Sequence, residues 1–176
     1  MTTRLSYPDE PLHALMQSTA RRYPDRIALR FADRTVTFAD FDRESNRLAH
    51  GLRALGLTRG DRLGLFVPNC PECELAFYAA SKLGAIATPL NPSYTAREIA
   101  YQLNDAGAKV LMTHQRLWPS VAPVRRQLSS LEAVVIVGAR PDDAPMDVRS
   151  YAQVSSGQAA SPPDIDVDPE DIVALH

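Results

Sequence analysis

The stretch that decides the fold is residues 85–113, which read AIATPLNPSYTAREIAYQLNDAGAKVLMT. Two short apolar runs, 85–90 and 109–113, enclose a segment whose apolar residues recur at helical spacing. Thr95 and Glu98 form a capping-box pattern where this segment begins, and Gly107 is a typical helix end. The stretch therefore predicts a strand, a helix and a second strand, an arrangement typical of parallel sheets.

The same alternation continues on both sides of this unit. Apolar runs at 63–67 and 133–137 are separated from it by further helical segments. Repeated units of this kind predict an α/β fold with a parallel, doubly wound sheet flanked by helices.

The helices between these runs carry their own end signals. Asn69 with Glu72 predicts the cap of one helix, which should end at Gly84. Apolar spacing over 117–128 predicts another helix, shortened or kinked by its two prolines.

The sequence before residue 62 predicts two helices and a hairpin. Apolar spacing indicates a helix from Pro11 to Arg22, and a second helix runs from a capping signal at Thr37 to Gly56. The runs 27–31 and 35–38 predict two strands joined by a polar turn.

The composition changes near residue 140. Residues 141–170 contain seven acidic residues, one basic residue and five of the chain's 14 prolines. We therefore expect an α/β subdomain over 1–140, a surface excursion or linker over 141–170, and the start of a buried strand over 171–176. A natural domain seldom stops as a buried strand begins, so we expect a piece of a longer protein.

Charge and composition exclude several classes of function. Charged residues make up 23% and the net charge is only -2, which gives no field that would attract nucleic acid or anionic lipid. No apolar run reaches the roughly 18 residues of a membrane span, and the first residues do not resemble a signal peptide. We expect a cytoplasmic protein, in agreement with only two cysteines.

The two cysteines raise one alternative function. Cys70 and Cys73 follow a predicted strand and open a predicted helix, where a helix dipole can lower a thiol pKa. This spacing permits an independent thiol-redox or binding module. The alternative interpretation, two small side chains near a helix start, agrees better with the Asn that precedes Cys70 and with the helix and hairpin that come first.

Other candidate sites are weaker. Four histidines at 13, 50, 114 and 176 and one cysteine pair do not form a zinc pattern. Glycine spacing matches no nucleotide-binding loop. His50 is interpreted as a solvated helix residue, and His114, at the carboxyl end of a predicted strand, is a site candidate.

The function is predicted from motifs that resemble those of a known family. Residues 37–42, with 46–52, resemble the first core motif of the adenylate-forming superfamily, and residues 81–92 resemble its second. Residues 91–109 are similar to the version found in fatty acid CoA ligases, and Gly84 to Ala87 favours the CoA-ligase branch over peptide synthetases. Residues 168–175 are similar to the segment that leads into the family's phosphate loop.

The resemblance implies an ATP-dependent acyl-CoA synthetase. Such enzymes convert a carboxylate, ATP and CoA into acyl-CoA, AMP and pyrophosphate, through an acyl-adenylate and with Mg²⁺. All residues that the family uses for this chemistry would lie after His176, so the resemblance implies no catalytic, cofactor-binding or metal-binding residue in this chain. The expected role is an inactive scaffold whose partner is the remainder of the same protein.

Overall fold

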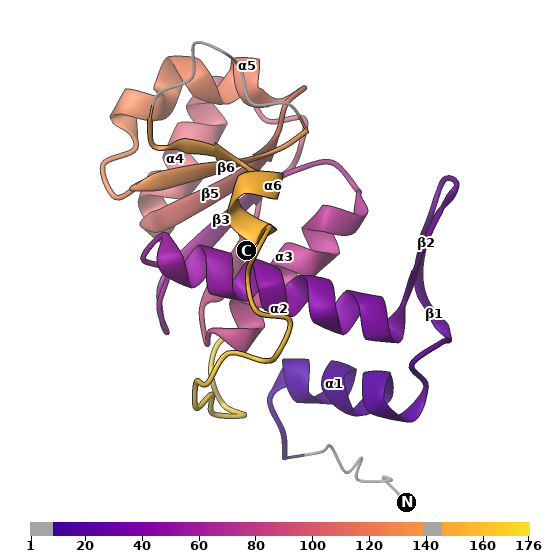
Figure 1. Cartoon of the computed structure of the whole chain (residues 1–176). Helices are drawn as coiled ribbons and strands as arrows, with labels where there is room; N and C mark the ends of the chain where they lie inside the picture. Colours follow the sequence, from indigo (N-terminus) through magenta and orange to yellow (C-terminus); the bar gives the residue numbers. More distant parts are fainter. Residues whose placement is uncertain (1–8, 139–145) are drawn as a thin grey trace, which may run out of the picture.

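A five-stranded parallel sheet forms the centre of the computed structural model, which describes residues 9–138 and 146–176 (Figure 1). The strand order is β4-β3-β5-β6-β7, and every neighbouring pair is parallel. The strands are β3 (Arg62–Phe66), β4 (Ile86–Pro89), β5 (Ala108–His114), β6 (Ala133–Val137) and β7 (Val148–Ser150). The predicted α/β fold with a parallel sheet is confirmed.

The central strands are apolar because both faces of the sheet are covered. All five residues of β6 are buried. Its alternate side chains enter two different apolar clusters. Val135 packs in the cluster on one face of the sheet, and Ile136 packs in the cluster on the opposite face. A parallel strand that is covered on both sides has no solvated face, which explains the continuous apolar runs in the sequence.

The helices divide between the two faces of the sheet. The first layer consists of α1 (Leu12–Arg22), α2 (Phe38–Ala54), α3 (Pro71–Lys82) and α6 (Tyr151–Ser155). The second layer consists of α4 (Ala96–Ala106), α5 (Trp118–Val121) and the 3-10 helix η1 (Ala122–Gln127). The expected short or kinked helix over 117–128 is therefore confirmed as α5 followed by η1.

Helix ends follow the predicted signals in two cases and differ in a third. Thr95 and Glu98 form the capping box of α4, and Gly107 ends that helix with a left-handed φ of 62°. The hydroxyl of Thr37 accepts a hydrogen bond from the amide of Asp40 at the start of α2.

The predicted cap at Asn69 is wrong. Cys70 is the residue that precedes α3, and its side chain makes no capping hydrogen bond. Pro71 begins the helix with its fixed φ and has no N–H that would need an acceptor, so α3 starts one residue later than the Asn69 pattern indicated.

The predicted hairpin is present. Strands β1 (Ile27–Phe31) and β2 (Arg34–Thr37) pair antiparallel and form a separate two-stranded sheet. The hairpin turns at Ala32, whose φ is 47°. Figure 1 shows that it projects beyond the amino-terminal end of α2.

The expected surface excursion over 141–170 is wrong for residues 148–155. These residues form β7 and α6, and Val148 is fully buried in the sheet. Val154 of α6 packs so closely on α2 that a Cβ on Gly51 would lie 2.1 Å from its carbonyl oxygen. Residues 1–8 and 139–145, which include the expected boundary at 140, lie outside the described residues.

Residues after α6 run along the first helical layer without regular secondary structure. The side chain of Asn46 donates to the carbonyl of Ala160 at 2.8 Å, and Nε2 of His50 lies 3.0 Å from the carbonyl oxygen of Ser161. His50 is therefore half-buried and bonded to the backbone rather than simply solvated.

The last segment adds to the edge of the sheet. The expected buried strand over 171–176 is wrong: these residues make only one isolated parallel bridge, between Ala174 and Ala87 of β4, and Ile172 and Leu175 are exposed. Among the described residues, no helix combines the length and the apolar character needed to cross a membrane.

Candidate functional site

The strand order defines where this sheet could bind a ligand. The chain enters at β3, adds β4 on one side, and then crosses over to place β5 on the other side. Open parallel sheets bind ligands beyond the carboxyl ends of their strands, where the order reverses. The candidate site therefore lies beyond the ends of β3 and β5.

A cluster of charged side chains occupies this position. Arg34, from the hairpin, lies 2.6 Å from Oε1 of Glu72 at the start of α3 and 2.9 Å from Oε2 of Glu44 on α2. Tyr151 at the start of α6 is half-buried beside them. Burial raises the pKa of the Tyr151 phenol, and the carboxylates of Glu44 and Glu72 raise it further, so the hydroxyl stays protonated. The positive charge of Arg34 is thus already compensated by two carboxylates.

His114 ends β5 at this edge, as the sequence predicted. Its Nδ1 accepts a hydrogen bond from the amide of Arg116 at 3.1 Å. Burial lowers the pKa of His114, the charge of Arg116 lowers it further, and Glu72 opposes both. In the described part of the chain, no serine, threonine or cysteine donates to the ring. A general base paired with a nucleophile is therefore not formed here.

The cysteine pair lies at the same edge but lacks the property that redox chemistry requires. Both thiols are free and half-buried. Burial raises the pKa of Cys73 to about 11, with Glu74 adding to the effect, and burial also raises the pKa of Cys70. Burial at the start of α3 therefore outweighs the helix dipole, and the thiol pKa is not lowered as the thiol-redox alternative expected.

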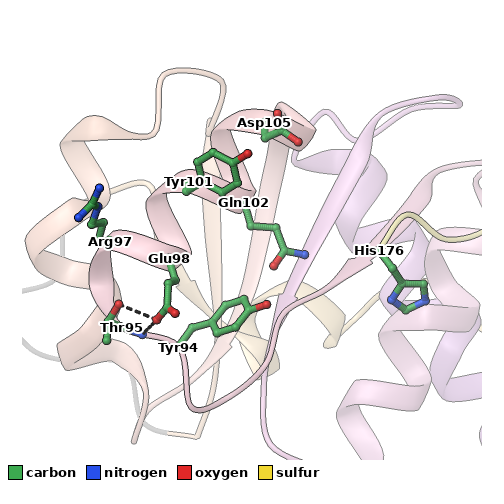
Figure 2. Close-up of a pocket in the computed structure, with 8 residues that line it drawn as sticks. All are labelled: Tyr94, Thr95, Arg97, Glu98, Tyr101, Gln102, Asp105 and His176. Atoms are coloured by element: carbon green, nitrogen blue, oxygen red, sulfur yellow. Dashed lines mark hydrogen bonds between the residues drawn. The ribbon is translucent and has the colours of Figure 1, made fainter.

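A second hollow lies away from the switch point. A groove of about 720 Å³ separates α4 from the end of the chain (Figure 2). Its polar groups are partly engaged already. Glu98 accepts from the hydroxyl and the amide of Thr95, and Gln102 donates to the carbonyl of Pro89 at 3.1 Å. The lining residues are Tyr94, Thr95, Arg97, Glu98, Tyr101, Gln102, Asp105 and His176.

Sequence reasoning missed this groove. Its walls come from residues 94–105 and from residue 176, which are far apart in the chain. No local pattern connects these segments, because they meet only when the last segment joins the edge of β4. Tyr101 is 73% exposed on α4, but this exposure is known only from the structure and gave no signal in the sequence.

Sequence reasoning also missed a buried lysine. Lys82 is 1% exposed at the end of α3. Its ammonium lies 2.6 Å from Oδ1 of Asp42, 2.5 Å from Oδ1 of Asn46 and 2.8 Å from the hydroxyl of Ser45. Burial lowers the pKa of Lys82, and the Asp42 carboxylate opposes that shift. All three partners lie on α2, so this lysine joins two helices.

The described residues do not fit the phosphate groups of a nucleotide. A phosphate cradle needs backbone N–H groups converging at a glycine-rich turn on the ligand edge of the sheet. Gly60, Gly84 and Gly107 have positive φ, but each precedes a strand and so lies at the opposite, amino edge. Gly138 also has positive φ and follows β6 at the carboxyl edge, but the side chain of Gln115 fills the space beside it, 2.6 Å from where a Cβ would lie. Within residues 9–138 and 146–176, no three His, Cys, Asp or Glu side chains converge on a metal position.

Two ion-paired cations connect elements of the first helical layer. The ion pairs of Arg34 and Lys82 tie the hairpin, α2 and α3 together, and the apolar clusters tie these helices to the sheet. The candidate site at the carboxyl edge has neither a nucleophile relay nor a phosphate cradle among the described residues.

Comparison with known proteins identifies a matching family and similar ligases. A family model described as "AMP-binding enzyme" matches residues 16–176. The chain is 32% identical to a long-chain-fatty-acid–CoA ligase from Bacillus subtilis over 136 residues, which is 77% of this chain and 24% of that protein. It is 36% identical to 4-coumarate-CoA ligase 1 from Narcissus pseudonarcissus over 170 residues, or 94% of this chain and 30% of that protein.

A solved structure matches the fold closely. The anthranilate CoA ligase AuaEII, in complex with anthranoyl-AMP, superposes with a TM-score of 0.89 and 28% identity, covering 96% of this chain and 32% of that one. The chain thus spans about a third or less of the length of each of these proteins.

Proposed function

Because the chain belongs to the AMP-binding enzyme family, we propose that it is the amino-terminal part of an ATP-dependent acyl-CoA synthetase. The reaction of the whole protein would join a carboxylic acid to CoA and release AMP and pyrophosphate. The observation that carries this proposal is the family match over residues 16–176, together with CoA ligases among the relatives. The resemblance of residues 81–92 to the CoA-ligase version of the second motif supports it.

ATP, Mg²⁺ and CoA are the co-substrates and metal that this reaction requires. The described residues offer no phosphate cradle, so we place these groups on residues beyond His176 and assign no step of the reaction to this chain. The chain itself supplies the parallel sheet and the helical layers on which such residues could be held. We propose a cytoplasmic location for the whole protein.

For the acid, we propose a fatty acid. Residues 91–109 are similar to the version of this segment in fatty acid CoA ligases, and a long-chain-fatty-acid–CoA ligase is among the relatives. An aromatic acid is the second candidate. The 36% identity with a 4-coumarate ligase over 170 residues and the match to an anthranilate ligase favour it.

Exchange of labelled pyrophosphate into ATP tests the proposal directly. The 176-residue chain and the protein carrying its native continuation would be compared with Mg²⁺ and either a series of fatty acids or 4-coumarate. We expect acid-dependent exchange by the longer protein and none by the 176-residue chain, because the charge-stabilising donors that the reaction needs are not in this chain.

The outcomes separate the possibilities. Exchange with 4-coumarate but with no fatty acid would establish the second candidate. Exchange by the 176-residue chain alone would contradict the scaffold role, and no exchange by the longer protein with any acid would contradict the proposed reaction.

A further inference from the structure

The end of the chain points to the ligand edge of the sheet. Ala174 pairs with Ala87 of β4 in the parallel direction. The segment therefore runs the same way as β4 and reaches His176 at the carboxyl edge, where open parallel sheets bind their ligands. Whatever follows His176 begins at that edge.

Few contacts fix this segment in its place. The amide of Ala87 donates to the carbonyl of Val173, and the amide of Leu175 donates to the carbonyl of Ala87, both at 2.9 Å. Ile172 is 62% exposed and Leu175 is 44% exposed, so the apolar burial of this segment is limited to the half-buried Val173 and Ala174. A segment held in this way opens easily unless another interaction holds it.

Arg59 provides that interaction. One end of its guanidinium, Nη2, lies 2.8 Å from Oδ1 of Asp171, and Nη1 donates to the carbonyl of Asp166 at 3.3 Å. The other carboxylate oxygen of Asp171 accepts from the amide of Asp168 at 3.1 Å. The carboxylate thus connects the loop before β3 with the turn that precedes the edge segment.

The position of Arg59 is itself fixed by the sheet. Its stem crosses Gly84, where a Cβ would lie 2.9 Å from Cγ of Arg59. The next residue, Gly60, donates its amide to the carbonyl of Gly84 at 2.9 Å. Arg59 therefore connects the loops that precede β3 and β4 with residues 166–171.

We propose that Arg59 and Asp171 are positioning residues that set where the chain leaves the sheet, and thereby orient a phosphate-binding segment beyond His176. This inference rests on the proposed function. Backbone donors bind phosphate well only when they are held in place beforehand, so loosening their attachment should weaken ATP binding more than it weakens binding of the acid.

The attachment can be tested in the 176-residue chain by hydrogen exchange. We expect Arg59→Ala and Asp171→Asn to speed exchange at the amides of Ala87 and Leu175. The matched control is Arg126→Ala, because Arg126 is an exposed arginine on η1 with no ion pair among the described residues. Unchanged protection of the amides of Ala87 and Leu175 in both Arg59→Ala and Asp171→Asn would overturn the inference.

The positioning role is tested by kinetics of the protein with its native continuation. Pyrophosphate exchange should show the KM for ATP raised about two- to fivefold in Arg59→Ala, the size usual for an exposed ion pair, with the KM for the acid unchanged. Arg59→Lys keeps the charge but has one nitrogen in place of the two that reach Asp171 and Asp166. Its KM for ATP should lie between those of the unaltered protein and Arg59→Ala. An unchanged KM for ATP, or equal changes for both substrates, would overturn the positioning role even if exchange at Leu175 increases.

These measurements distinguish failure of the proposed function from failure of the positioning role. Absence of exchange activity in the unaltered longer protein would refute the proposed function and the positioning role with it. The hydrogen-exchange result would then still decide whether Arg59 and Asp171 hold the edge segment.

Discussion

The ammonium nitrogen of Lys82 lies 2.6 Å from Oδ1 of Asp42, and this ion pair joins α3 to α2 inside the protein. The lysine is almost completely buried, whereas the side chain of Asp42 is 21% exposed. Burial of an ammonium is unfavourable unless its donors are satisfied, and here Ser45 and Asn46 complete the set. Removal of the lysine would leave the Asp42 carboxylate without its ion-pair partner and Oδ1 of Asn46 without this donor.

We therefore expect Lys82→Met to lower the free energy of unfolding by about 3 kcal/mol, the effect usual when one half of a buried pair is removed. Adding Asp42→Asn should restore part of the loss, because it removes the unpaired charge. Urea unfolding of both variants and of Arg126→Ala would measure this. A Lys82→Met protein as stable as Arg126→Ala would show that the pair contributes nothing.

Gly51→Ala should destabilise the protein although alanine favours helices. The substitution gains about 1 kcal/mol of helix propensity. The new Cβ would, however, lie 2.1 Å from the carbonyl oxygen of Val154, and overpacking of this kind costs about 1 to 3 kcal/mol or more. Thermal unfolding should show a lower Tm, with Arg53→Ala on the exposed side of α2 as the control. A raised Tm would mean that α6 does not pack on α2.

His13 should make stability fall below neutral pH. Burial lowers the pKa of His13, and the nearby charge of Lys82 lowers it further. The folded protein therefore favours the neutral ring, and protons bind preferentially to the unfolded chain. Stability is present above the unfolded pKa of about 6.5 and is lost as the pH falls below it.

Comparison of Tm at pH 7.5 and pH 5.5 checks this expectation. We expect His13→Gln to show a smaller fall in Tm between these two values than the unaltered chain. Equal falls in both proteins would indicate that His13 does not contribute.

The cysteine thiols should react slowly in the folded protein. The rate of iodoacetamide labelling follows the thiolate, and the pKa of Cys73 is raised to about 11 by burial. Labelling of Cys73 should therefore continue to accelerate well above pH 9, and unfolding in urea should speed it at pH 8. Mass spectrometry of labelled peptides would follow both sites. Fast labelling at pH 7, or a disulfide-reductase activity lost in Cys70→Ser, would restore the redox alternative.

The edge beside β4 should promote self-association of the 176-residue chain. Ile172 and Leu175 expose apolar side chains next to a sheet edge, a combination that favours pairing between copies. Light scattering after size exclusion should show less association in Ile172→Lys/Leu175→Lys. Met146→Lys replaces an even more exposed apolar residue elsewhere, and an equal effect of that change would argue against the edge as the contact.

Much of the fold could be read from the sequence because its signals are local. The capping box at Thr95 and Glu98, the left-handed end at Gly107 and the apolar run of β6 each depend on residues near one another in the chain. Together such signals predicted the parallel sheet and most of its strands and helices, though not β7 and α6, and the motif resemblance predicted the family that the comparisons confirm.

The sequence could not place the acidic segment correctly. Its acidic and proline-rich composition indicated an excursion, yet Val148 and Val154 are buried in it. Composition averages over a window, whereas burial depends on whether a few apolar residues find a partner surface. For this segment the partners are β6, the preceding strand, and α2, which lies far away in the sequence.

The sequence by itself determined most of the elements, the fold class and the family, because helix and strand signals and motifs are written in contiguous residues. Only the tertiary structure decided that the cysteine thiols are shielded, that Lys82 finds three partners on α2, and that Arg59 holds Asp171 at the edge of the sheet. Charge and reactivity depend on which groups lie within a few ångströms and on how much water reaches them. Chain folding sets both, and it brings together residues as far apart in the sequence as 59 and 171.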